Sequence, residues 1–399
     1  MRRTYRALND YEMQHNAEVG LFTRPSTFEN KDSITMQNDI LRSNREILSE
    51  HYDLGELIRK ERITRGYIND SFEIEVLRDQ GKSRYLLRRY RTGTHEEKIR
   101  FEHALLNELQ KRKFKFSPLI IATKEGTTYV KTDRHLIAQA QENYAAIFSY
   151  LPGKDKYSWD TPFCSDRELI NAAKILALYH NTIYDWKGII SWKAPSNIHK
   201  IKLMAKQWKG YAQNTGKSPF DIYFLKQFEY LLRMSTKIPS KSAYDSMPRL
   251  AIHGDYHPGN LKFQNGKVTG VFDFDWSRMD VRCLDVGLAI IYFCTSWDET
   301  RDGKLLLDRV ENFLVSYQEA ANEIKAIGPL NQLELEYLPE MIHMGNLSLL
   351  DWTLSDFYST SSDPRVYLKY LQHSVRLNRW LESNYQALTS CVQKHNLLP

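Results

Sequence analysis

Cysteine is scarce in this sequence. Only 4 of the 399 residues are cysteines, and they lie far apart, with no Cys-x-x-Cys pair among them. This spacing argues against a disulfide framework and against a metal site built from thiolates. Long apolar segments are also missing: the longest, from Leu288 to Cys294, is too short to cross a bilayer, and the N-terminus has no signal-peptide core. We therefore expect a cytoplasmic protein with no membrane partner.

A block of charge of one sign is absent as well. The net charge is +6, and Lys and Arg are interleaved with Asp and Glu, which argues against nucleic acid as a partner. The chain is instead rich in aromatic residues, with 24 Tyr, 17 Phe and 8 Trp. This composition is typical of a folded protein, and because 399 residues exceed the usual size of one core, we expect two packed lobes.

The order of apolar patterns divides the chain. Residues 1–50 are polar and irregular and are interpreted as an N-terminal extension. Residues 51–150 hold short segments rich in β-branched and aromatic residues and one helical pattern over 95–112, in the order strand, strand, strand, helix, strand, strand. Residues 151–399 follow helical patterns, broken by short strands over 250–275. The sequence therefore predicts an α+β fold with a small, mainly antiparallel β lobe and a larger, mainly helical lobe.

A hairpin can be derived inside LAIHGDYHPGNLKFQNGKVTGVFDFDW, which begins at residue 250. Asn265-Gly266 is a strong signal for a two-residue turn. A turn centred there pairs Phe263 with Val268 and Leu261 with Gly270.

The same register brings oxygen-bearing side chains together at the open end of the hairpin. Asn260 falls opposite Val271, so Asp273 lies one step beyond it, within reach of a shared cation. An amide oxygen and a carboxylate suit Mg²⁺. Asp255 follows His253-Gly254 on the loop that enters the hairpin, where its carboxylate can accept the proton of an attacking hydroxyl. This spacing is that of the kinase catalytic loop and metal loop.

The segment HGDYHPGN, followed by FDFDW, resembles the aminoglycoside phosphotransferase and choline/homoserine kinase superfamily, which has the two-lobed protein-kinase-like fold. The resemblance implies transfer of the γ-phosphoryl group of ATP to a hydroxyl of a small amino alcohol, amino acid, amino sugar or aminoglycoside. It implies Asp255 as catalytic base, Asn260 and Asp273 as Mg²⁺ ligands, and His253 as a brace of the catalytic loop. Protein kinases carry Lys where His257 stands, and no Ala-Pro-Glu segment follows, which favours a small-molecule acceptor.

The resemblance also assigns residues to the nucleotide. The turn TRGYINDSF stands where the family covers the phosphates, which implies binding by Gly66, Asn69 and Ser71, although these residues also suit an ordinary hairpin. The segment AIFSYLPG resembles the hinge at which the family binds adenine through backbone groups, here those of Ser149 and Leu151. The alternative for this segment is an edge strand that runs into a turn.

Arg88 departs from the family pattern. It ends the segment YLLR, where kinases carry their phosphate-binding Lys. An arginine can grip phosphate oxygens bidentately and stays charged, so the role is chemically accessible to it. Its expected partner is Glu102 on the following helix, with Glu97 and Glu108 as surface alternatives.

Other acidic and aromatic residues have less specific expectations. Asp285 precedes an apolar helical segment and is expected to cap that helix. The acceptor pocket is expected in the last hundred residues, where Asp351, Trp352, Asp356 and Tyr358 could line it.

Two alternatives to a small-molecule kinase stay open at this point: a Ser/Thr protein kinase, and a nucleotide-binding regulatory protein without turnover. The choice between ATP and GTP, the oligomeric state and the acceptor are open too, because homoserine, choline, aminoglycoside and sugar kinases share the catalytic residues. An acidic pocket would indicate a cationic acceptor, whereas a basic or mixed lining would indicate an amino acid or a sugar.

Overall fold

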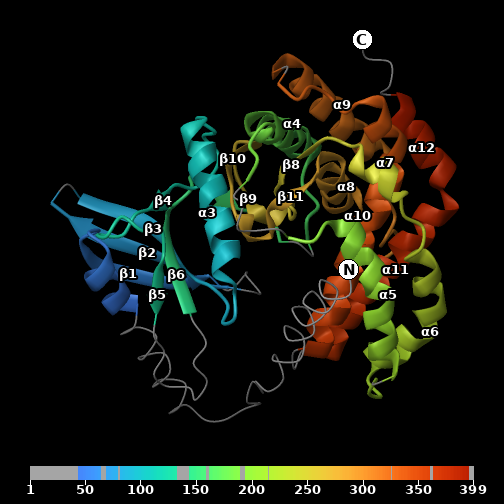
Figure 1. Cartoon of the computed structure of the whole chain (residues 1–399), viewed down its shortest axis with the longest axis horizontal. Coiled ribbons are helices and arrows are strands. Elements are labelled where there is room, and N and C mark those ends of the chain that lie inside the picture. The colour runs from blue at the N-terminus through green and yellow to red at the C-terminus, as the bar shows by residue number, and fades with distance from the viewer. Residues whose placement is uncertain are drawn as a thin grey trace, which may run out of the picture.

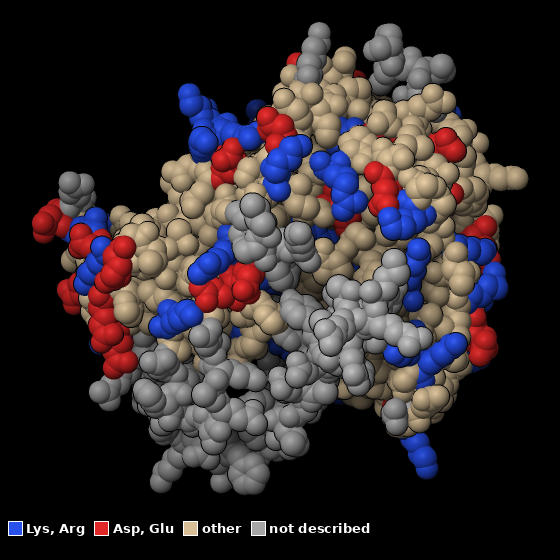
Figure 2. Space-filling model, viewed as in Figure 1, with Lys and Arg blue, Asp and Glu red and all other residues tan. Residues whose placement is uncertain are grey.

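The protein consists of a β-sheet lobe and a helical lobe (Figure 1). The computed structural model describes residues 44–63, 69–79, 81–132, 143–158, 161–188, 194–213, 215–324, 326–359 and 363–394. The predicted α+β fold is confirmed. Within these ranges, every helix is too short or too polar to span a bilayer. On the face shown in Figure 2, the Lys and Arg side chains of the described residues lie among Asp and Glu rather than in one block.

The small lobe is an antiparallel sheet with one main helix, α3 (Glu96–Lys111). The strands follow the order β1 (Glu56–Ile63), β2 (Asp70–Arg78), β3 (Gly81–Arg89), β6 (Asn143–Ser149) and β4 (Ile120–Ile121), and β5 (Val130–Thr132) also pairs with β6. The predicted order of strands and helix along the chain is confirmed, and the structure adds the short strand β4.

Burial alternates along β2, which gives the sheet two different faces. Phe72, Ile74 and Val76 are buried on one face. They belong to a cluster that includes Ile47, from the helical segment 44–51. The core of the small lobe therefore begins before residue 51, and α3 joins the main core of the protein.

The chain passes from the sheet to the helices at Pro152 and Gly153. Gly153 has a φ of +103°, and a Cβ atom there would lie 2.2 Å from Thr269 Oγ1, so this position requires glycine. The Thr269 hydroxyl donates to the Pro152 carbonyl at 2.7 Å. Strand β7 (Lys154–Asp155) then pairs with β9 (Leu261–Gln264), which fixes this hinge on the catalytic hairpin.

The large lobe surrounds one buried helix. Its helices are α4 (Asp166–Ile183), α5 (Asn197–Gln213), α6 (Pro219–Met234), α7 (Lys241–Asp245), α8 (Arg282–Cys294), α9 (Leu307–Ile324), α10 (Gln332–Ser359), α11 (Pro364–Ser383) and α12 (Tyr385–Gln393). Helix α8 is buried along its whole length and packs against α10 and α9. An all-round apolar helix requires such a position, because no face of it suits water.

The predicted hairpin is present as β9 and β10 (Lys267–Val271), with one error in its register. Phe263 pairs with Val268, as predicted, but an irregularity after Val268 makes Leu261 pair with Val271 instead of Gly270. A β-bulge adds one residue to a strand and shifts every later pair. Strands β8 (Arg249–Ile252) and β11 (Arg278–Val281) form a second pair beside the hairpin.

The start of α4 contains a buried carboxylate with several donors. Ser165 and Glu168 form a capping box, and the Glu168 carboxylate also accepts from Lys156 at 2.5 Å and from the Tyr157 hydroxyl at 2.7 Å. Burial alone would raise the pKa of Glu168, but these hydrogen bonds outweigh it and lower the pKa to about 2.

Replacement of Glu168 should therefore reduce stability in a pH-dependent way. Its pKa is lower in the folded chain than in the unfolded chain, so its contribution is present above the unfolded pKa and is lost as the pH falls through the folded value. We expect Glu168→Gln to lower the free energy of unfolding by about 2–3 kcal/mol at pH 7 and by less than half as much at pH 3, measured by urea denaturation. Glu299→Gln, at an exposed position, is the control, and a loss that does not change with pH would contradict this account.

Candidate active site

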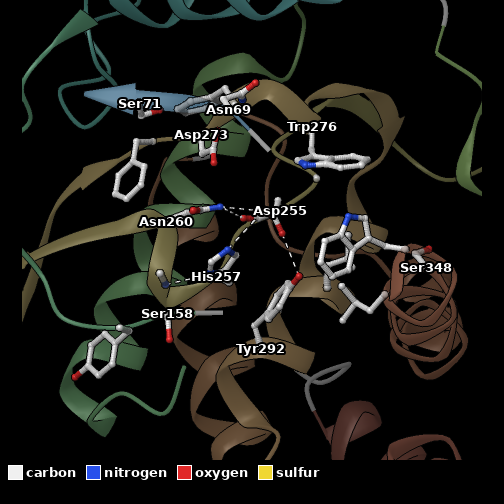
Figure 3. A pocket seen from close by; sticks show the side chains of 18 of the residues that line it. Asn69, Ser71, Ser158, Asp255, His257, Asn260, Asp273, Trp276, Tyr292 and Ser348 are labelled. Carbon is white, nitrogen blue, oxygen red and sulfur yellow. Dashed lines mark hydrogen bonds and ion pairs between the residues drawn. The ribbon is translucent and has the colours of Figure 1, made fainter. Parts of the chain in front are cut away.

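A cavity of about 430 Å³ lies between the two lobes and contains most of the predicted site residues. Those that line it are Asn69, Ser71, Arg88, Glu102, Ser149, Leu151, Asp255, Asn260 and Asp273. Gly66 lies outside the described residues. Figure 3 shows the part of the cavity around Asp255, where side chains from the catalytic loop, the hairpin and helix α8 converge.

Asp255 is held in place by hydrogen bonds to both carboxylate oxygens. Asn260 Nδ2 donates to Oδ2 at 3.0 Å and the Tyr292 hydroxyl donates to Oδ1 at 3.1 Å, while His257 Nε2 lies 3.5 Å from Oδ2 (Figure 3). Burial acts to raise the pKa of Asp255, but His257, His253 and Tyr292 together hold it below its usual value. The carboxylate is therefore ionised at neutral pH and can accept a proton.

Buried polar side chains hold the loop that carries Asp255 through hydrogen bonds to its backbone. The Asp285 carboxylate accepts the backbone N–H of His253 and of Gly254, both at 2.8 Å, and lies 3.0 Å from His180 Nε2. His253 is fully buried, accepts the Asp255 N–H at its Nδ1 at 3.3 Å, and places Nε2 3.1 Å from a backbone carbonyl. It does not line the cavity, and its contacts are with the backbone of the loop. These contacts fit the expected brace of the loop rather than a contact with substrate.

The expectation that Asp285 caps helix α8 is wrong. The helix begins at Arg282 after Val281, so Asp285 lies in its first turn and turns its carboxylate toward the catalytic loop. Its hydrogen-bond donors are backbone N–H groups more than 30 residues away along the chain. No local sequence pattern predicts such contacts.

Arg88 joins the two lobes through two ion pairs. Its Nη1 lies 3.0 Å from Glu102 Oε1 and its Nη2 lies 3.0 Å from Asp273 Oδ1. The predicted pairing with Glu102 is confirmed, and both side chains are buried. Burial acts to lower the pKa of Arg88, but the charges of Asp273 and Glu102 outweigh this effect and raise the pKa above its usual value. The guanidinium therefore stays charged.

Negative charge exceeds positive charge around Arg88. Asp273 and Asp275 lie near the same guanidinium as Glu102. Asp273 Oδ1 has Arg88 as its ion-pair partner, whereas Asp275 Oδ1 lacks a hydrogen-bond partner within the described ranges. Asp273 occupies the left-handed region at φ 66°. Burial and the neighbouring Asp275 raise the pKa of Asp273 to about 7, although Arg88 opposes this. A cluster with this excess of buried carboxylates favours a bound cation.

The residues predicted to hold Mg²⁺ fit this requirement. Asn260 Nδ2 donates to the backbone oxygen of Asp255 at 2.9 Å and to its Oδ2 at 3.0 Å. In the described part of the chain, the side-chain amide oxygen of Asn260 makes no hydrogen bond. Together with Asp273 it offers two hard oxygen ligands. The described residues contain no group of three His, Cys, Asp or Glu side chains that could hold a metal. In kinases Mg²⁺ takes few protein ligands and is completed by phosphate and water oxygens, so two protein ligands would suit it.

The residues predicted to bind the nucleotide have defined protein contacts. Asn69 accepts the Arg91 N–H at 3.1 Å and donates to Asp275 Oδ2 at 3.1 Å, which ties the small lobe to the metal loop. Ser71 lies opposite Arg88 in the register of β2 and β3. At the hinge, the Ser149 N–H already donates to the Leu119 carbonyl at 2.8 Å, so this donor is engaged within the protein.

Sequence reasoning missed several residues of the cavity and misjudged others. Tyr292 was missed because it lies in the apolar sequence of α8, where it looks like a core residue. Its hydroxyl is the one feature of that sequence that could have suggested a polar role. Of the expected pocket residues, Asp351 and Trp352 line the cavity. Asp356 hydrogen-bonds to a tyrosine of α11 instead, and the Tyr358 hydroxyl donates to a carboxylate of α6 at 3.0 Å.

Comparison with known proteins agrees with this geometry. The model of the phosphotransferase enzyme family matches residues 61–322. The homoserine kinase of Gluconobacter oxydans (strain 621H) is 22% identical over 329 residues, which cover 81% of this chain and 92% of that protein. The solved structure of a microcompartment-associated aminopropanol kinase is similar with a TM-score of 0.62 at 17% identity, covering 88% of this chain and 98% of its own.

A further solved structure, an amicoumacin kinase in complex with AMP-PNP and Ca²⁺, is similar with a TM-score of 0.58 at 12% identity, covering 89% of this chain and 96% of its own. The protein-kinase-like fold and the resemblance carried by HGDYHPGN and FDFDW are confirmed. The family model spans the sheet, the hinge and the catalytic hairpin. The chain therefore belongs to the phosphotransferase enzyme family and is a kinase-type phosphotransferase.

Proposed function

We propose that the protein transfers the γ-phosphoryl group of ATP, in the presence of Mg²⁺, to a hydroxyl group of a small amino acid or amino alcohol. The observation that carries this proposal is the arrangement of Asp255, whose ionised carboxylate lies in the same cavity as the cation-favouring pair Asn260 and Asp273. A proton acceptor beside a metal site is the arrangement that phosphoryl transfer to a hydroxyl requires.

The nucleotide lies between the lobes in this proposal. The adenine contacts backbone groups of the hinge near Leu151, and the phosphates extend toward Ser71 and Arg88. Mg²⁺, when bound, neutralises charge on the phosphates and on the buried carboxylates. The amicoumacin kinase, whose structure contains AMP-PNP and Ca²⁺, supports a nucleotide and a divalent cation in this fold.

Asp255 then acts on the acceptor. It orients the acceptor hydroxyl and takes its proton as the hydroxyl oxygen bonds to the γ-phosphorus and the bond to the β–γ bridging oxygen breaks. ADP leaves with that oxygen. Asn260 and Tyr292 keep the carboxylate aimed at the hydroxyl through their hydrogen bonds, and Asp285 holds the loop beneath it.

The acceptor end of the cavity favours a small molecule over a protein chain. Helices α5 and α10 contribute Asn197, Ser348 and Trp352 to its lining, so this end is enclosed by the helical lobe. The relatives named homoserine kinase and aminopropanol kinase support an acceptor with a primary hydroxyl and an amino group.

Removal of the base should abolish turnover without unfolding the protein. We expect Asp255→Asn to lower kcat by about 10²-fold or more, as for the loss of a general base. The measurement is Mg²⁺-dependent ADP release across homoserine, serine, choline, ethanolamine, 3-aminopropan-1-ol and aminoglycosides. Asp308→Asn, at an exposed position at the start of α9, is the matched control. If no compound raises ADP release by the wild type above that of Asp255→Asn, the proposal fails.

The planar geometry of the Arg88 guanidinium, and not only its charge, should contribute to the use of MgATP. Arg88 holds Glu102 and Asp273 at the same time, whereas a lysine is a point charge that cannot reproduce this geometry. We expect Arg88→Lys to stay folded and to lose about tenfold in kcat/KM for MgATP, and Arg88→Met to lose about 100-fold or more. Arg84→Lys, at an exposed position on the same strand, should keep wild-type kinetics. Equal losses in Arg88→Lys and Arg88→Met would contradict a role for the retained charge.

A further inference from the structure

The end of the cavity beyond Asp255 is lined by positive charge. In Figure 3, Asp255 lies between Asn260 on one side and Trp276 and Ser348 on the other. Lys200, from α5, and Arg278, from β11, also line the cavity. Arg278 hydrogen-bonds to the backbone of Trp276, and Lys200 follows Asn197, which hydrogen-bonds to Ser348, by three residues on α5.

Arg278 lies against the catalytic loop. Its Nη1 donates to the Trp276 carbonyl at 3.2 Å, and a Cβ atom placed on Gly254 would lie 3.0 Å from the same nitrogen. The guanidinium therefore contacts the backbone immediately before Asp255. A group of the acceptor that bound Arg278 would therefore be separated by only a few covalent bonds from the acceptor hydroxyl at Asp255.

Lys200 has cations for neighbours. It is half-buried, and in the described ranges its ammonium makes no hydrogen bond or ion pair. Burial, Arg278 and Lys98 lower the pKa of Lys200 to about 8, with Asp280 and Asp351 acting in the opposite direction. Lys98 reaches this region from α3 of the small lobe, where its Nζ lies 5.0 Å from the centre of the Trp276 ring.

The nearby carboxylates leave Lys200 without a partner. Asp280 is fully buried and accepts the Tyr244 hydroxyl at 2.7 Å, the Asn197 N–H at 3.0 Å and Arg278 Nε at 3.4 Å. Arg249 Nη2 also lies 3.6 Å from Asp280 Oδ1, so this one carboxylate serves two arginines. Asp351 accepts Trp208 Nε1 at 2.8 Å. A half-buried ammonium without a carboxylate partner, in a cavity that a buried arginine also lines, is unfavourable until an anion joins it.

We propose that Lys200 and Arg278 form an anion subsite, so that the phosphoryl acceptor carries a carboxylate or phosphate group beside the hydroxyl presented to Asp255. This inference rests on the proposed function and narrows its acceptor to an anionic or zwitterionic hydroxyl compound. Asp351 also lines the cavity, and its carboxylate, which accepts from Trp208 Nε1, adds a negative charge that favours an ammonium group on the ligand. The mixed lining therefore suits a hydroxy amino acid better than a purely cationic amino alcohol or aminoglycoside.

The test compares two acceptors that differ only in a carboxylate with a third acceptor that carries a phosphate and has no amino group. Homoserine and 3-aminopropan-1-ol share the hydroxyl and the amine, but only homoserine has a carboxylate, and 3-hydroxypropyl phosphate presents a phosphate instead. We expect the wild type to prefer one anionic acceptor over 3-aminopropan-1-ol by about tenfold or more in kcat/KM, and the better of the two anionic compounds identifies the group.

Replacement of Lys200 should remove this preference. We expect Lys200→Met to raise the KM for the anionic acceptor by about 10- to 100-fold, with little change in the KM for MgATP or for 3-aminopropan-1-ol. Lys200→Arg should restore most of the affinity. Lys202→Met, at an exposed position on the same helix, is the control and should behave as the wild type. The melting temperature of each variant verifies its fold.

Different outcomes separate this inference from the proposed function. If 3-aminopropan-1-ol is used as well as the anionic acceptors, and Lys200→Met leaves both KM values unchanged, the anion subsite is wrong even though turnover still requires Asp255. If Lys200→Met instead raises the KM for MgATP, the cations serve the nucleotide, which also overturns the inference.

A binding measurement covers the case in which no acceptor is turned over, which would overturn the proposed function. Calorimetry then compares 4-aminobutanoate, which lacks the hydroxyl, with propylamine on the wild-type protein and on Lys200→Arg and Lys200→Met. Tighter binding of 4-aminobutanoate that is lost in Lys200→Met supports the subsite, and equal binding of the two compounds overturns it.

Discussion

The site depends on one buried guanidinium that meets carboxylates from both lobes. Arg88 belongs to the sheet, Glu102 to α3 and Asp273 to the loop after the catalytic hairpin, and Arg88 lies 3.0 Å from each partner. Burying these charges separately would be costly, so they must lie together, and this fixes how the sheet, the helix and the metal loop meet. Because acids outnumber the single arginine, the cluster also favours a bound cation.

A second polar network sets the position of Asp255, the proposed base. Helix α8 is buried on all sides and supplies both Asp285, which holds the backbone of the catalytic loop, and Tyr292, which contacts Asp255 directly. Asp255 is therefore held in place by a helix that is buried along its whole length. Since His253 and His180 are fully buried around the same network, its geometry is determined by core packing as much as by hydrogen bonding.

The charged side chains differ between two parts of the cavity lining. Carboxylates outnumber cations around Arg88, whereas Lys200, Arg278 and Asp351 line the part proposed for the acceptor. The phosphoryl group transferred in the proposed reaction passes between these regions, next to Asp255. A kinase whose acceptor is itself anionic must offset repulsion between two negatively charged substrates, and cations on the acceptor side do so.

The sequence by itself determined the elements whose signals are local. The loop from His253 to Asn260 and the following Asp273 identified the chemistry, because the spacing of kinase catalytic residues is short and specific. The strands and α3 followed from periodicity, and Glu102 was correctly chosen as the partner of Arg88. Tertiary structure alone decided the rest, because those contacts join residues far apart in the chain. The bulge in the hairpin shifted a register that turn chemistry had set. Asp285 hydrogen-bonds to the catalytic loop instead of capping helix α8. Lys200 and Arg278 lie on different elements, α5 and β11, which only the fold brings to one cavity.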